Sequence, residues 1–214
     1  MKSRKYLYLG IGGAVAIAAI IFVISYNEKS ETPKVDSLSL DFTYDEANSV
    51  LKQSLQSQGI VISSPLRFQK QQEIEKWCKF FSDSEKQKLV EYCTSTEIKD
   101  QSGKFLGNIH LVGSPSAPKL VLVVLESNPL LDNMNQIKTV FGTVTKELVC
   151  DCWQAVKPDG YETVENWVDA LRDFHISGSK PHSESKSISL ASKHMQIQLT
   201  TTKEGYVWKM LIAR

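Results

Sequence analysis

The sequence predicts an α+β protein with one N-terminal transmembrane helix, followed by one domain in which a largely antiparallel sheet packs against several helices. Three observations predict this class. An uncharged apolar run opens the chain, helical and strand patterns succeed it without regular βαβ units, and short turns join several of the expected strands. The chain beyond the run is long enough for one hydrophobic core and short for two.

The apolar run is long enough to span a bilayer. Residues 1–5, MKSRK, carry three basic side chains, and residues 6–26, YLYLGIGGAVAIAAIIFVISY, carry no charge. A helix of about 20 residues spans roughly 30 Å, the thickness of the hydrocarbon core. Basic residues before the run and mixed charges after it predict a cytoplasmic N-terminus and an exported remainder. We therefore expect a single-pass cell-membrane protein, held in the lipid bilayer by a signal-anchor helix at 6–26.

A cleaved signal peptide is the alternative to an anchor. Signal peptides have an apolar stretch of about 7–15 residues and a small-residue cleavage site. The run here is longer, and the sequence SYNEKSET that ends it has no such site. The sequence therefore favours an uncleaved anchor, a polar stalk at 27–40 and an exported α+β domain at 41–214.

The charge of the expected domain argues against nucleic acid as a partner. The whole chain has 25 Lys and Arg against 24 Asp and Glu, a formal charge of +1. Three of the basic residues lie in the tip at 1–5, which leaves 22 against 24 and a net charge of −2 for the rest. A basic surface of the kind that binds phosphate backbones is not indicated.

The domain opens with a capped helix. Thr43 and Glu46 form a capping-box pattern before a helical stripe of apolar residues, and Gly59 provides a stop. We expect a helix at 44–58 and a short strand at 60–63.

A second helix and three strands are expected next. The helix at 68–82 is predicted from apolar residues on one face. Strands are expected at 90–99 and 105–113, around the turn DQSG, and at 119–126. The last of these, KLVLVVLE, is nearly continuous in apolar residues and is typical of a central strand covered on both faces. The residues of the helical face are Ile74, Trp77, Cys78 and Phe81.

Two further helices and a closing pair of strands complete the pattern. Asn128 with Pro129 indicates a helix start, and the apolar stripe continues to Leu148. A shorter helix covers 164–174. A polar loop is then expected at 177–186, and the alternating segments 187–200 and 206–213 are predicted strands joined around TKEG.

The four cysteines are the main candidate site residues. They are Cys78, Cys93, Cys150 and Cys152, the last two within VCDCWQ. In an exported domain an even number of cysteines indicates disulfides. A direct bond between Cys150 and Cys152 is geometrically poor on a helix or a strand, because strand Cα atoms at this spacing lie roughly 6.5–7 Å apart.

Two arrangements of the cysteines stay open. Crossed pairs would join Cys78 and Cys93 to one member each of the Cys-Asp-Cys sequence. Alternatively, Cys78 pairs with Cys93, which leaves Cys150 and Cys152 as free thiols or as a strained bridge.

Metal and catalytic patterns are not indicated. A second C-x-x-C or a paired-His motif is missing from the sequence, and the four histidines look like ordinary surface and loop residues. We assign no catalytic residue, metal ligand or cofactor. His175 near Asp173 is the one candidate acid–base couple, and a helix end often carries such neighbours. The tryptophans, with Trp153 the least certain, are expected in the core.

Two functions are consistent with these observations. The anchor, the stalk and the lack of catalytic motifs favour a non-enzymatic module that binds an envelope protein or a small ligand. Its last strand, GYVWKMLIAR, is apolar on both faces, so at a sheet edge it would accept a partner strand, although a central position is favoured. The alternative is a thiol–disulfide redox protein using Cys150 and Cys152. That pair comes after an expected helix, whose C-terminal end disfavours a thiolate.

Overall fold

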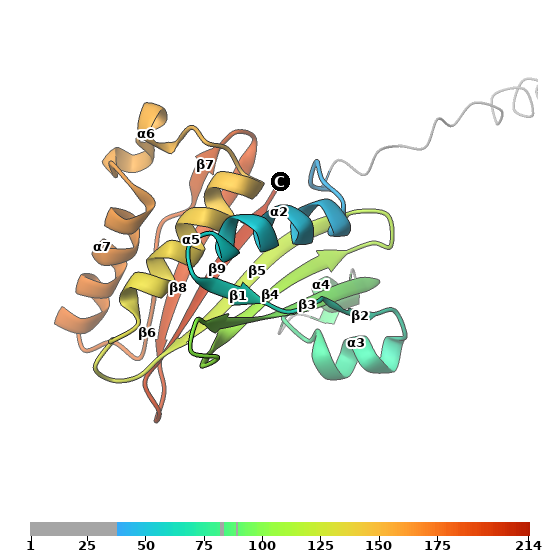
Figure 1. Cartoon of the computed structure of the whole chain (residues 1–214), viewed down its shortest axis with the longest axis horizontal. Helices are drawn as coiled ribbons and strands as arrows, with labels where there is room; N and C mark the ends of the chain where they lie inside the picture. The colour runs from blue at the N-terminus through green and yellow to red at the C-terminus, as the bar shows by residue number, and fades with distance from the viewer. Residues whose placement is uncertain (1–37, 82–83, 89) are drawn as a thin grey trace, which may run out of the picture. The chain divides into compact units, whose positions relative to one another are not determined.

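The structure, a computed structural model, describes residues 38–81, 84–88 and 90–214. The expected tip at 1–5, the anchor at 6–26 and most of the stalk lie outside the described residues. From Leu38 onward, none of the described helices is both long and apolar enough to cross a membrane. The described residues form an α+β domain with a large antiparallel sheet, which confirms that part of the expected class (Figure 1).

Within the described residues, nine strands form one sheet, and neighbouring strands in it pair in antiparallel fashion. The strand order is β1-β3-β4-β5-β9-β8-β6, with β2 also paired to β3 and β7 also paired to β8. The predicted final strand is β9, and it lies in the middle of the sheet between β5 and β8. The strands are β1 (Ile60–Ile62), β2 (Leu66–Phe68), β3 (Tyr92–Asp100), β4 (Phe105–Gly113), β5 (Pro118–Ser127), β6 (His182–Glu184), β7 (Ile188–Leu190), β8 (Lys193–Thr201) and β9 (Tyr206–Ala213).

Three helices cover one face of the sheet and form the main core with it (Figure 1). They are α2 (Tyr44–Gln56), α5 (Met134–Leu148) and α7 (Val164–Ser177). In α2 the residues Ala47, Leu51 and Leu55 recur every four positions and are buried, as an amphipathic helix requires. The predicted capping box is confirmed, since Thr43 Oγ1 accepts from the Glu46 N–H while Glu46 accepts from the Thr43 N–H.

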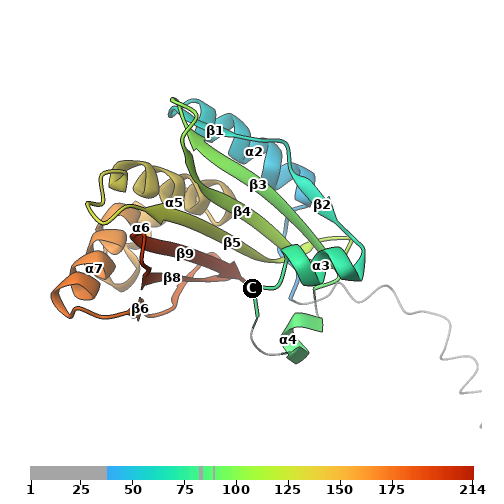
Figure 2. The same ribbon diagram turned by 90° about the horizontal axis from the view of Figure 1, so that it is seen from below.

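Among the described residues, helices cover the opposite face of the sheet only at one end. Helices α3 (Gln71–Trp77) and α4 (Ser84–Lys88) lie there, and we call this pair the cover (Figure 2). A second, smaller apolar cluster fills the space beneath it, and includes Ile74, Val90 and Val112. The expectation that 119–126 is central holds for β5, but its second face is covered only in part, since the side chain of Val124 is half-buried.

The helix predicted at 68–82 is wrong in its bounds. Residues Leu66–Phe68 pair with β3 as strand β2, and α3 occupies only Gln71–Trp77. Trp77, expected on the buried face, is 56% exposed and lies beside the ammonium of Lys76. Pairing of Phe68 with Cys93 puts the Phe68 side chain on the face that the cover shields, so tertiary packing overrides the helical pattern there.

The helix expected to start at Asn128 begins later, at Met134. The Asn128 side chain and backbone instead hold a turn, accepting hydrogen bonds from the N–H groups of Asp132 and Leu131. Leu131 has φ = 56°, which no helix allows. The short polar side chain of Asn128 therefore forms a turn in place of a helix cap.

The C-terminal region contains more strands than expected. The polar loop predicted at 177–186 includes β6, and the strand predicted at 187–200 divides into β7 and β8. Ala191 and Ser192 join these two strands with φ values of 48° and 62°, a two-residue hairpin turn. The helix predicted at 164–174 and the final strand at 206–213 are both present.

Candidate functional site

The first disulfide joins the cover to the sheet. Cys78, directly after α3, bonds to Cys93 in β3, with their Cα atoms 6.4 Å apart. Both residues are fully buried and belong to the small cluster under the cover, together with Ile74 and Val112. This disulfide therefore ties the chain directly after α3 to strand β3 of the sheet.

The second disulfide joins Cys150 and Cys152, so the crossed pairs and the free thiols are both wrong. The Cα atoms lie 5.2 Å apart, within the usual disulfide range. Neither a helix nor a strand carries the pair. After α5 ends at Leu148 the chain makes a turn, where the Cys150 N–H donates to the Thr145 carbonyl. The crossed pairs fail because Cys78 and Cys93 pack on the cover side, whereas this turn packs against the main core.

The turn that contains Cys150 and Cys152, here called the CDC turn, borders a polar cavity of about 570 Å³. Both cysteines are half-buried, and Cys150 contributes to the wall. Lys146, one helical turn earlier, lies with its ammonium 3.3 Å from the carboxylate of Asp151, and both side chains are more than half exposed. The CDC turn therefore lies between the main core and this polar cavity, with both cysteines partly exposed.

Trp153 fixes the inner side of the CDC turn. Its side chain is 6% exposed, its Nε1–H donates to the Tyr161 carbonyl at 3.1 Å, and its ring centroid lies 5.6 Å from that of Trp167. Trp153 begins α6 (Trp153–Val156), a helix of four residues. The prediction of a core tryptophan is confirmed for this least certain case.

The position of the CDC turn is unfavourable for a stabilised thiolate. Cys150 lies just past the C-terminal end of a 15-residue helix, where the unpaired carbonyl groups carry partial negative charge. The thiols of efficient disulfide oxidoreductases lie instead near helix N-termini or basic groups. Lys146 supplies a positive charge nearby, but Asp151 is ion-paired with it.

Two of the four histidines, His175 and His110, differ from the surface residues that the sequence indicates, whereas His182 and His194 are exposed as expected. His175 is 1% exposed; its Nδ1 lies 2.9 Å from Ser183 Oγ and its Nε2 lies 2.8 Å from Thr201 Oγ1. Burial lowers the pKa of His175, and the nearby charge of His182 lowers it further. The expected couple with Asp173 does not form, because the Asp173 carboxylate is paired with a neighbouring arginine.

His110 is a second partly buried histidine, on the side of the sheet that carries the cover. Its ring centroid lies 4.7 Å from that of Phe80, and its Nδ1 has no hydrogen-bond partner among the described residues. Burial lowers the pKa of His110 to about 4. In the described part of the chain, no three His, Cys, Asp or Glu side chains are grouped so as to hold a metal ion.

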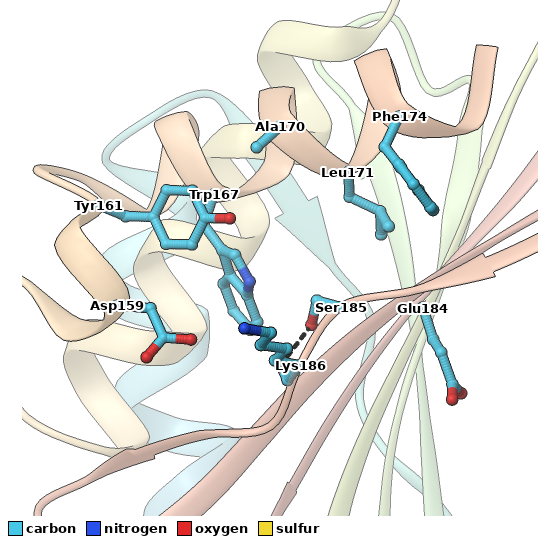
Figure 3. A pocket seen from close by; sticks show the side chains of 9 residues that line it. All are labelled: Asp159, Tyr161, Trp167, Ala170, Leu171, Phe174, Glu184, Ser185 and Lys186. Atoms are coloured by element: carbon cyan, nitrogen blue, oxygen red, sulfur yellow. Dashed lines mark hydrogen bonds between the residues drawn. The ribbon is translucent and has the colours of Figure 1, made fainter. Parts of the chain in front are cut away.

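A further cavity, of about 500 Å³, lies between α7 and the segment directly after β6 (Figure 3). Trp167, Leu171 and Phe174 extend from α7 into its wall, and Glu184 and Lys186 come from the other side (Figure 3). The short helix η1 (Pro158–Gly160) and its flanks complete it. The φ values there are unusual, since Lys157 and Asp159 both lie near 50°. Such backbone strain is common at binding sites, but the sequence gives no signal for it.

Comparison with protein-family models, curated proteins and solved structures finds no match for this chain.

Proposed function

We propose that this chain is a membrane-anchored, extracytoplasmic domain that binds an envelope protein and is not an enzyme. The partner adds an extended segment to the free edge of strand β6. One observation carries this proposal: in the part of the chain that the structure describes, the sheet ends at β6, and that edge lies beside the cavity of Figure 3. The last strand, β9, is paired on both sides, with β5 and β8, so it cannot accept a partner strand. We therefore place the added strand at β6.

The hydrogen bonds of β6 leave its outer edge open. The Thr201 N–H donates to the Pro181 carbonyl and the Ser185 N–H donates to the Ile197 carbonyl, both at 2.9 Å. Bonding residues alternate along an antiparallel strand, so the N–H groups of His182 and Glu184 point away from β8. Both residues are exposed, and neither N–H donates to another described residue. This edge offers main-chain groups to an added strand.

The adjoining cavity supplies selectivity to such an edge. Trp167 and Leu171 give it an apolar floor, and the ring of Phe174 is 52% exposed at its margin. In strand addition, main-chain hydrogen bonds provide affinity while pockets for alternate side chains choose the partner. We expect the added segment to be extended and to carry a bulky apolar side chain that enters this cavity.

The site around His175 supports binding better than catalysis. A histidine between two hydroxyl groups resembles a nucleophile and its base, but an acyl-transfer site also needs N–H donors directed at the developing oxyanion. The N–H groups of Thr201 and Thr202 are already used, donating to the carbonyls of Pro181 and Gly205. The contacts of His175 therefore hold α7 against the sheet.

The proposal is tested by cross-linking the full-length protein in its native membrane, with a photoreactive residue in place of Phe174. We expect one specific adduct, lost in Glu184→Pro, which removes an outward N–H without touching the bonds to β8. Glu184→Ala keeps that N–H and serves as the matched control, with the adduct retained. An absence of any specific adduct, or equal adducts in both variants, would contradict the proposal.

A second candidate function is thiol–disulfide exchange at the CDC turn, favoured by a partly exposed disulfide of which Cys150 lines a cavity. A substrate thiolate attacks one sulfur, the bond between Cys150 and Cys152 breaks, and the other cysteine leaves as a thiolate. A second substrate thiolate then displaces the first cysteine, so the substrate dithiol is oxidised to a disulfide and the CDC turn is reduced by two electrons. An insulin-reduction assay that is unaffected by Cys150→Ser would eliminate this function.

A further inference from the structure

Helix α3 of the cover and the first described residues lie at the same end of the sheet (Figure 1). The Leu40 N–H donates to the Pro118 carbonyl, and Pro118 pairs with Gly113 at the hairpin between β4 and β5. Gly113 in turn pairs with Tyr92, which precedes the Cys93 that is bonded to the residue after α3. The chain therefore enters the domain at the end of the sheet where α3 lies.

Two large apolar side chains are exposed at this end. Trp77, the last residue of α3, is 56% exposed, and Leu66, the first residue of β2, is 64% exposed. Leu66 pairs with Ser95, two positions along β3 from Cys93, so both apolar side chains lie near the disulfide that holds the end of α3. A tryptophan has an apolar ring system and one N–H group, which suits it to the boundary between water and the apolar part of a bilayer.

The segment that carries Trp77 is basic. Residues 66–79 contain four basic side chains against two glutamates, a net charge of +2, whereas residues 6–214 as a whole carry −2. Lys70, Lys76 and Lys79 are exposed, and none of them forms a salt bridge with a described residue. Lys76 Nζ lies 4.6 Å from the centroid of the Trp77 ring. Positive charges beside an exposed aromatic ring are complementary to the negative surface of an anionic bilayer.

We propose that this end of the domain lies against the anionic phospholipid headgroups of the membrane. The inference rests on the proposed anchor, because a chain that leaves the bilayer before Leu38 enters the domain at this end. Trp77 and Leu66 enter the headgroup region, and the three exposed lysines contact lipid phosphates. Strand β6 forms the opposite edge of the sheet from β1 and β2, so the partner site proposed there stays clear of the lipid.

The distribution of tryptophans makes this contact measurable. The chain has four, none of them in the expected anchor, and Trp153, Trp167 and Trp208 are at most 6% exposed. The full chain is reconstituted in vesicles of phosphatidylglycerol and phosphatidylcholine, with and without phospholipids brominated near the headgroup, which quench a tryptophan that they contact. We expect bromination to remove about a quarter of the emission, the share of one tryptophan in four. Trp77→Phe should abolish that loss, which assigns it to this ring.

Charge reversal tests the contact with lipid phosphates. Lys76→Glu with Lys79→Glu should reduce the quenching at least about twofold, because lysines near an anionic bilayer strengthen binding to it. Lys104→Glu with Lys203→Glu changes two exposed lysines at the opposite end of the sheet and is the matched control, with quenching retained. Salt at about 1 M should also weaken the quenching of the parent chain, since it screens exposed charges. That measurement stays decisive if a charge-reversed variant unfolds, as a thermal melt would reveal.

Flotation of the vesicles separates this inference from the proposed anchor. A chain that does not float with the vesicles contradicts the anchor, and the inference fails with it. A floating chain whose emission is unchanged by bromination overturns the inference alone. The same holds for quenching that is equally strong in vesicles of phosphatidylcholine, that salt leaves unchanged, or that is equal in the two charge-reversed variants.

Discussion

The two disulfides differ in burial and in the length of the loop that each one closes. Cys78–Cys93 is fully buried and closes a loop with a sequence separation of 15, whereas Cys150–Cys152 is half-exposed and closes a loop with a separation of 2. Chain-entropy reasoning gives about 3 kcal/mol for the longer loop and about 1.5 kcal/mol for the shorter one. The first disulfide therefore contributes to the stability of the fold. The second contributes less, so its role is either to shape the turn locally or to take part in chemistry.

The largest expected effect on stability comes from removing the disulfide Cys78–Cys93. Cys78→Ala with Cys93→Ala should lower the free energy of unfolding by at least about 3 kcal/mol, through the lost loop constraint and the cavity left beneath the cover. Urea denaturation of the full chain in detergent, followed by near-UV circular dichroism, measures this. A loss equal to that of the Cys150→Ala, Cys152→Ala pair would remove the distinction between the two disulfides.

Acid should destabilise the region beneath the cover, where the ring of His110 packs beside that of Phe80. His110 has its pKa lowered to about 4 by burial, against an ordinary value near 6.5 in the unfolded chain. The unfolded chain therefore binds the proton first as pH falls. The linked effect on stability is absent above about pH 6.5, grows as pH falls, and is complete below about pH 4. Allowing for partial exposure, the loss from this one group should be about 2 kcal/mol.

Comparison with His110→Gln isolates this effect, because His175 is retained in both proteins and titrates in the same direction. The stability difference between His110→Gln and the parent should change by about 2 kcal/mol from pH 7 to pH 4. Parallel pH profiles for the two proteins would show that His110 does not couple acid to folding.

Much of the fold is predictable because long periodic segments dominate it. The capping box at Thr43 and Glu46, the strand pattern of β4 and the helical stripe of α7 each obey local rules. Where prediction fails, the deciding contacts are distant. Phe68 becomes part of a strand because β3 lies beside it, and the turn at Asn128 uses a side chain that also suits a helix cap.

The candidate sites are less predictable than the fold. The four cysteines are evident in the sequence, but their pairing depends on which face of the sheet each one occupies, and periodicity does not specify that. Helix geometry and strand geometry both disfavour a bond between Cys150 and Cys152. The bond forms because the chain between α5 and α6 is a turn, neither helix nor strand. The free edge at β6 arises from the meeting of separate segments, so no local pattern signals it.

A smaller effect is expected at the CDC turn. Cys150→Ala with Cys152→Ala should lower the free energy of unfolding by about 1.5 kcal/mol or less, since the closed loop is so short. Unreduced protein treated with a mild thiol should also expose these two thiols first, measured by alkylation and mass spectrometry. If Cys78–Cys93 were reduced before Cys150–Cys152, the two disulfides would not differ in accessibility as we expect.

The smallest effect is expected from the charge beside that turn. Lys146 and Asp151 are 57% and 79% exposed, and exposed ion pairs of this kind contribute about 0–1 kcal/mol. Lys146→Ala should therefore change the free energy of unfolding by less than about 0.5 kcal/mol, as judged by the same urea titration. If the ammonium instead assists attack on the disulfide, the variant would slow alkylation after mild reduction while leaving stability unchanged. A change in stability without a change in reduction rate would show that Lys146 holds the turn in place. Thiol–disulfide exchange at Cys150–Cys152 would then lack assistance from this ammonium group, the positive charge nearest to it.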